Sequence, residues 1–130
     1  MQDLQGIINQ NLHTLCEKQK LMGAVVFNVD GLVLGSYVSV KAQEQFGNRV
    51  DEIIAAMGAV FDDITMRAQE DLEMENINEV AINSKNHKIV FRLFSVENRN
   101  FMLGLIVRPY ASYRRATTMV IKQIAEAMSG

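Results

Sequence analysis

The spacing of hydrophobic residues changes several times along this 130-residue chain, and the order of these changes limits the possible folds. Residues at helical spacing come first, then two extended runs, a second helical segment, three extended runs and a last helical segment. This αββαβββα order predicts an α+β fold. We expect a single antiparallel five-stranded sheet with helices on both faces. One proline and no low-complexity stretch leave no sign of a linker, so we expect one domain over residues 1–130.

The first half of the chain predicts a helix followed by a hairpin. Apolar residues three and four apart place a helix over residues 2–20. The extended runs 24–29 and 32–38 flank Asp30-Gly31, a dipeptide typical of tight hairpin turns. We therefore expect the first two strands to be antiparallel neighbours.

The second half predicts a long helix, a meander and a final helix. Residues 39–48 are polar and end at Asn48, which we expect to cap a helix that runs to about Leu72. Pro109 can end the last strand and begin the final helix. Short polar turns separate the last three extended runs, which are residues 80–82, 89–94 and 101–108. The final helix should bury an apolar stripe of Tyr110, Tyr113, Ala116, Val120, Ile121, Ile124 and Ala127.

The long second helix carries two apolar sets. The larger set should face the sheet and consists of Val50, Ile53, Ile54, Met57, Val60, Phe61, Ile64 and Ala68. Ala55, Ala59 and Met66 form a smaller set almost opposite. One explanation is that the two alanines are simply good helix formers and the methionine is exposed by chance. The other is that the set forms a second contact surface, where small side chains let another helix approach closely.

The composition argues against several classes of protein. A formal net charge of −2 gives no general attraction to nucleic acid. Cys16 is the single cysteine, so no internal disulfide forms, and we expect a small buried hydrophobe there. The apolar runs are far shorter than the roughly 20 residues of a membrane helix. No secretory signal is visible at the N-terminus, so we expect a cytoplasmic protein.

No pattern of a catalytic, metal or cofactor site is present. His13 and His87 have no partner at a recognised ligand spacing. The stretch Gly31–Ser36 lacks the lysine of a phosphate loop. We therefore expect neither an enzyme nor a cofactor. The acidic residues of the second helix should form a solvated face, whereas a basic bias near the last helix favours solubility or could steer an acidic partner. The basic residues are Arg108, Arg114, Arg115 and Lys122.

Four segments in order resemble the roadblock family, which includes the dynein light chain and MglB-like regulators of Ras-like GTPases. They are Gly23-Ala24-Val25-Val26-Phe27, Asp30-Gly31-Leu32-Val33-Leu34-Gly35-Ser36, Ile53-Ile54-Ala55-Ala56-Met57 and Phe101-Met102-Leu103-Gly104-Leu105. The resemblance covers roughly residues 4–128 and implies a profilin-like layout. It also implies a non-catalytic platform that binds and regulates a Ras-like small GTPase, as a co-activator of hydrolysis or as a scaffold.

The resemblance further implies a homodimer. The long helices would pair antiparallel and the third strands would meet edge to edge. Applied to this chain, the interface residues would be Ala55, Ala59 and Met66 on the helix and Val80, Ala81 and Ile82 on the strand.

Two other functions stay open. A small-molecule sensor module of the PAS or GAF kind has a similar arrangement but needs an internal pocket with polar groups. Asn28, Ser36 and Arg92 are the polar residues within extended runs that could supply them. The chain could also be a scaffold subunit of a heterodimer.

Overall fold

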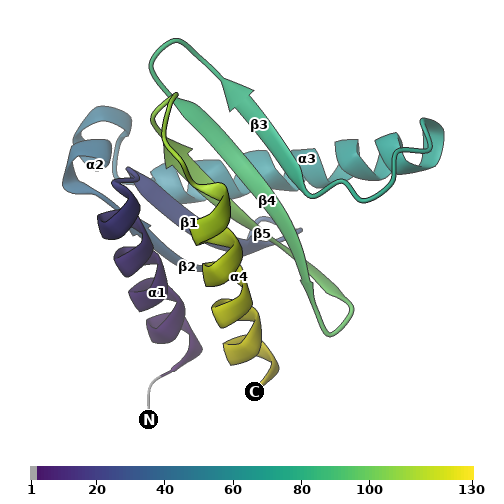
Figure 1. Cartoon of the computed structure of the whole chain (residues 1–130), viewed down its shortest axis with the longest axis horizontal. Helices are drawn as coiled ribbons and strands as arrows, with labels where there is room; N and C mark the ends of the chain where they lie inside the picture. Colours follow the sequence, from purple (N-terminus) through teal and green to yellow (C-terminus); the bar gives the residue numbers. More distant parts are fainter. Residues whose placement is uncertain (1–2) are drawn as a thin grey trace.

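The structure is a computed structural model that describes residues 3–130. One antiparallel sheet of five strands lies between helices on both faces, in the predicted order with one short helix added (Figure 1). The helices are α1 (Leu4–Gln19), α2 (Val40–Phe46), α3 (Val50–Asp71) and α4 (Arg114–Ser129). The strands are β1 (Gly23–Asn28), β2 (Val33–Val38), β3 (Glu79–Asn83), β4 (Lys88–Val96) and β5 (Arg99–Val107).

The strand order across the sheet is β2-β1-β5-β4-β3. The first hairpin and the meander each pair strands that are neighbours in sequence. The two units join where β1 pairs with β5, in a register that sets Val25 opposite Gly104. This order leaves β2 and β3 at the two edges of the sheet.

The predicted hairpin turn is confirmed, and Asn28 holds it in place. Its side-chain oxygen accepts hydrogen bonds from the backbone N–H groups of Asp30 and Leu32, both at 3.0 Å. Gly31 has a φ of 86°, a backbone region that side chains disfavour. The Asp30-Gly31 dipeptide therefore supplies both the conformation and the position of the turn.

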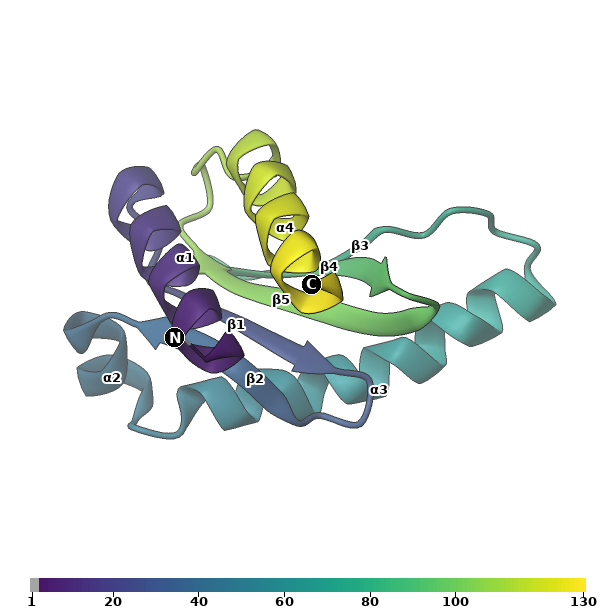
Figure 2. The ribbon, with the colours of Figure 1, turned by 90° about the horizontal axis from the view of Figure 1, so that it is seen from below.

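Helices α1 and α4 lie side by side on one face of the sheet (Figure 2). Asp3 caps α1 by accepting a hydrogen bond from the Gly6 N–H at 2.7 Å. Buried residues of both helices meet the inward side chains of β1, β4 and β5 in one continuous core. Its buried members include Ile8, Leu12, Leu15, Cys16, Val26, Val90, Leu103, Leu105, Val107 and Ile124.

The predicted start of the last helix was wrong. Helix α4 begins at Arg114, five residues after Pro109. Tyr110 lies in the preceding loop and is fully exposed, so it does not belong to the buried stripe. Tyr113 is buried, at the N-cap position of α4.

Helix α3 covers the opposite face, where Val25, Phe27, Phe91, Met102 and Ile106 point away from α1 and α4. It lies mainly over β1, β2 and β5, and its Phe61 ring also contacts the ring of Phe91 in β4, at 5.2 Å between ring centres. The C-terminal end of α3 extends beyond the sheet (Figure 2). One helix therefore covers this face only in part.

The connection between β2 and α3 also differs from the prediction. Residues 39–48, which we expected to form a polar loop, contain helix α2. Ser39 caps the N-terminus of α2, because its hydroxyl accepts a hydrogen bond from the Ala42 N–H at 3.1 Å. Asn48 does not cap α3. The N-cap position is Arg49, which makes no side-chain capping bond and instead pairs with Glu52 at 2.7 Å.

Candidate functional site

The orientation of α3 differs from the predicted one. The residues buried against the sheet are Val50, Ile54, Ala55, Gly58 and Thr65. A side-chain carbon added at Gly58 would overlap the ring of Phe27, so the glycine lets the helix backbone lie directly on that ring. The predicted stripe of larger residues is therefore only half buried, because the helix is turned toward its smallest residues.

The other half of the predicted core stripe faces solvent. Ile53, Val60 and Ile64 are 53%, 61% and 50% exposed, respectively. Together with the half-buried Met57 they are spaced 4, 3 and 4 residues apart and fall within an arc of about 60° on the helix surface. We call Ile53, Met57, Val60 and Ile64 the α3 stripe. Its spacing is that of a seam between two packed helices.

The three helix residues predicted for the interface do not lie together on an open surface. Ala55 is completely buried, and its backbone carbonyl lies against Gly31 in the hairpin turn. Ala59 is half-buried beside the same turn. Met66 is exposed. The small side chains do permit a close approach, but the element that approaches is the β1–β2 turn, so the placement of Ala55 on a contact surface was wrong.

Strand β3 lies at the edge of the sheet, as expected. It pairs with β4, and within residues 3–130 no strand lies on its other side. Val80 and Ile82 are half-buried and pack with the core of the α3 face. Ala81 is exposed and is opposite Val90, whose side chain belongs to the core under α1 and α4. The outward backbone groups of residues 79–83 are therefore free to pair with another strand.

A hollow of about 350 Å³ separates the N-terminal half of α3 from the start of β4. Ile53 and Met57 line one wall, and Ile89 and Ile106 line the sheet side. Phe46 of α2 closes one end, where it contacts the ring of His87 edge to face at 5.1 Å. The hollow therefore continues the α3 stripe from Ile53 and Met57 as far as Ser84, the residue directly after β3.

Polar contacts hold β3 to α4 on the other face of the sheet. Arg92 of β4 donates to the carbonyl of Arg114 at 2.9 Å and to the hydroxyls of Thr117 and Thr118 at 2.7 and 2.8 Å. Glu79 accepts from Arg114 at 3.0 Å. These bonds connect the first residue of the edge strand to the start of the last helix.

The same network surrounds the side chain of Tyr113. Burial raises the pKa of the phenol, and the negative charge of Glu79 raises it further. Among the described residues, neither the Tyr113 hydroxyl nor the Arg92 Nε has a hydrogen-bond partner. Sequence reasoning missed this network, because no motif indicates that Glu79 and Arg114 are close in space.

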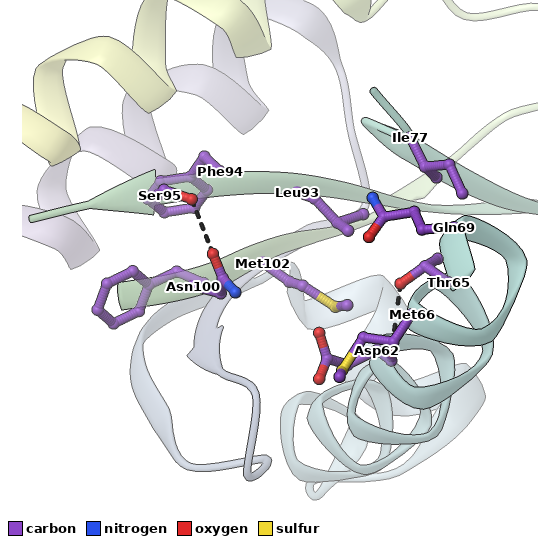
Figure 3. A pocket seen from close by; sticks show the side chains of 11 residues that line it. Asp62, Thr65, Met66, Gln69, Ile77, Leu93, Phe94, Ser95, Asn100 and Met102 are labelled. Atoms are coloured by element: carbon purple, nitrogen blue, oxygen red, sulfur yellow. Dashed lines mark hydrogen bonds between the residues drawn. The ribbon is translucent and has the colours of Figure 1, made fainter. Parts of the chain in front are cut away.

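A second pocket, of about 280 Å³, lies between the C-terminal half of α3 and the end of the β4–β5 hairpin (Figure 3). Asp62, Gln69 and Asn100 point into it, and Met66 lies at its rim. Desolvation raises the pKa of Asp62, and the neighbouring charges of Asp63 and Asp30 raise it further. Thr65 donates its hydroxyl proton to the Asp62 carbonyl at 2.9 Å, so its polar group is already satisfied.

The polar residues considered for a sensor pocket do not converge. Asn28 holds the hairpin turn, and Arg92 is bonded to α4. The backbone N–H of Ser36 donates a hydrogen bond to Asn9 Oδ1 at 2.8 Å, and its hydroxyl donates to Asp51 Oδ2 at 3.4 Å. Each of the three therefore holds a different part of the fold in place.

Cys16 and His13 likewise make contacts that hold the fold together. Cys16 is buried, and burial raises the pKa of its thiol to about 12. His13 lies 2.8 Å from Glu17 and stacks on Tyr37. Between residues 3 and 130, no three histidine, cysteine or acidic side chains form a group that could hold a metal ion. No helix in the same range has the length and apolar character needed to span a membrane.

Comparisons with known proteins find similarity in structure but not in sequence. No protein-family profile and no curated protein sequence matches the chain. The Roadblock/LC7 domain from Streptomyces avermitilis aligns with a TM-score of 0.78 at 12% identity, covering 94% of this chain and 98% of that one. Gliding protein MglB from Thermus thermophilus aligns with a TM-score of 0.72 at 13% identity, covering 99% of this chain and 90% of that one.

A third solved structure, Myxococcus xanthus MglB, aligns with a TM-score of 0.68 at 11% identity. The alignment covers 94% of the present chain and 84% of the Myxococcus xanthus chain. The shared features are the single antiparallel sheet and the helices on its two faces. The chain therefore has the roadblock/LC7 fold, as its four motifs predicted.

Proposed function

We propose that this chain forms a homodimer that binds and regulates a Ras-like small GTPase and supplies no catalytic group of its own. The observation that carries the proposal is the exposed α3 stripe beside the unpaired edge of β3, in a fold shared with the MglB structures. Large apolar side chains gathered on one exposed surface are typical of interaction sites. This proposal keeps the helix and strand predicted for the interface but changes the face of the helix.

In the proposed dimer, the α3 stripe of one copy packs antiparallel on that of the other. The spacing of Ile53, Val60 and Ile64 suits the packing of two helices. The backbone of Val80, Ala81 and Ile82 then pairs with the same strand of the second copy, which removes the open edge. Ala59 and Met66 lie on nearly the opposite side of α3 from the stripe, beside the β1–β2 turn and the polar pocket respectively, and do not contribute to this interface.

The proposed platform acts by positioning. Hydrolysis of GTP in Ras-like proteins depends on residues of the GTPase held where charge develops, so a bound protein can accelerate it without a catalytic group. A scaffold role uses the same binding surface without a change in rate. The heterodimer alternative differs only in the chain that covers the α3 stripe.

The test is Val60→Asp, which places a charge in the centre of the stripe. The wild-type chain should have twice the 14.6 kDa mass in light scattering over a dilution series, and the variant should have the single mass. Its circular dichroism should be unchanged, because Val60 is 61% exposed. Met119→Asp is the matched control, since Met119 is similarly exposed on α4. A variant that remains dimeric would show that the stripe is not the interface.

The same variants test the function. Purified Ras-like GTPases, loaded with a non-hydrolysable GTP analogue, should bind the wild-type dimer and the Met119→Asp control but not Val60→Asp. Rates of phosphate release with GTP then separate a co-activator from a scaffold. A dimer that binds none of the tested GTPases would argue against the platform, and a wild-type monomer would favour the heterodimer.

A further inference from the structure

A basic hollow of about 500 Å³ lies at one end of the sheet, apart from the α3 stripe. Its lining includes Lys41 and Gln45 of α2, His87 before β4, and Arg108 and Tyr110 after β5, with Met22 at its floor. We call this site the basic hollow.

The topology explains why these residues meet. Neighbouring strands in the sheet are antiparallel, so the start of β1 and β4 and the end of β2, β3 and β5 lie at the same end. Figure 1 shows α2, the β3–β4 turn and the β5–α4 loop gathered there. Gln45 lies 3.5 Å from His87, which connects α2 to the turn.

The charge of the basic hollow is opposite in sign to that of the whole chain. The chain has 15 acidic and 13 basic residues, yet no acidic side chain of the described residues lines this site. Lys41 and Arg108 form no ion pair with any residue in the described range 3–130. Two cations and a histidine therefore converge with no compensating charge from that range, which favours a negatively charged ligand.

The hollow also has an apolar component. Tyr110 is fully exposed although it is a large aromatic residue, and it stands beside Pro109 at the rim. Exposed tyrosines next to cationic side chains are frequent anchors of protein interfaces. Because Lys41, Gln45 and Arg108 are themselves exposed, the hollow is shallow, whereas sites for small molecules bury most of the ligand.

We propose that the basic hollow docks an acidic peptide segment of a partner protein. The carboxylates of the segment would lie against Lys41 and Arg108, and an apolar side chain would pack on Tyr110. The proposal is separate from the dimer, since it uses the end of the sheet and not the α3 stripe.

The test uses a synthetic peptide of alternating glutamate and leucine, titrated into the full chain by calorimetry at low and high salt. The peptide should bind, and salt should weaken binding because exposed charges are screened. The double variant Lys41→Glu with Arg108→Glu should weaken binding by roughly tenfold or more. Tyr110→Ala should weaken it several-fold without a change in net charge.

The matched control is Lys18→Glu with Lys122→Glu, which changes the net charge equally at exposed positions of α1 and α4. It should bind the peptide nearly as well as wild type. Equal losses in the two double variants would overturn the proposal, since binding would then depend on overall charge alone. Absence of peptide binding would also overturn it, and binding of inorganic phosphate in its place would assign the hollow to small anions.

Discussion

The two faces of the sheet are built from the same five strands but are completed differently. On one face, α1 and α4 together bury a continuous set of side chains from β1, β4 and β5. On the other, α3 alone packs mainly on β1, β2 and β5, and apolar residues of β3 and β4 such as Val80, Ile82, Ile89 and Leu93 remain half-buried. The first face is complete within one chain, whereas the second leaves both the helix and the sheet edge partly uncovered.

The difference shows that an apolar residue has a different role on each face of the sheet. On the α1/α4 face, Leu12 fills the core and contributes to folding. On the α3 face, Ile53 is as hydrophobic but half exposed, and its burial would need another molecule. A comparison of matched substitutions on the two faces therefore separates residues that stabilise the monomer from those that serve assembly.

The largest effect on monomer stability is expected on the complete face. Leu12→Ala should lower the free energy of unfolding by about 3 kcal/mol, because the residues of a closed core cannot move in to fill the cavity. Ile53→Ala should change it by less than about 0.5 kcal/mol when measured at a concentration where the chain is monomeric. Urea denaturation measures both, and equal losses would contradict the distinction between the two faces.

A smaller effect is expected where α3 contacts the sheet most closely. Gly58→Ala improves helix propensity by about 1 kcal/mol but forces a side chain against Phe27, which costs about 1–3 kcal/mol. We expect a net loss of about 1 kcal/mol in the free energy of unfolding. In a Phe27→Leu background the added methyl should cost less, and a double-mutant cycle measures this coupling. Stabilisation by Gly58→Ala alone would show that the helix can move away from the ring.

The smallest effect concerns Asp62, beside the polar pocket on the same face. Its pKa is raised in the folded protein, so folding favours the protonated form and stability falls as pH rises above the ordinary carboxyl pKa of about 3.9. Asp62→Asn should therefore raise the melting temperature slightly at neutral pH. The gain should vanish at a pH below that ordinary value, where the folded and unfolded states are both protonated. A gain that persists in acid would point to a cause other than ionisation.

The sequence predicted the elements and their order because each has a local signal. Asp30-Gly31 marks the first turn, and the apolar runs of β1 and β5 are long enough to indicate strands covered on both faces. The short α2 has too few residues for a periodic pattern, although Ser39 at its cap was a usable signal. Pro109 suggested a helix start, but the chain forms a further loop before Arg114.

The candidate site was harder to predict, because α3 is apolar around much of its circumference. Hydrophobicity alone assigns Ile53, Val60 and Ile64 to the core. Their exposure follows from the fit of Gly58 over Phe27, a contact between residues 31 positions apart that no local pattern contains. The basic hollow likewise depends on topology, since Lys41 and Arg108 come from opposite halves of the sequence.

The pairing of β1 with β5 has a consequence for the order of folding. The first hairpin and the later meander can each form from neighbouring residues, but Gly23 pairs with Ile106 only after a loop of about eighty residues closes. Such distant contacts slow folding. During synthesis on the ribosome, the second edge of β1 must wait for β5, the last strand made. Until then the backbone groups of that edge remain open to other chains and to chaperones.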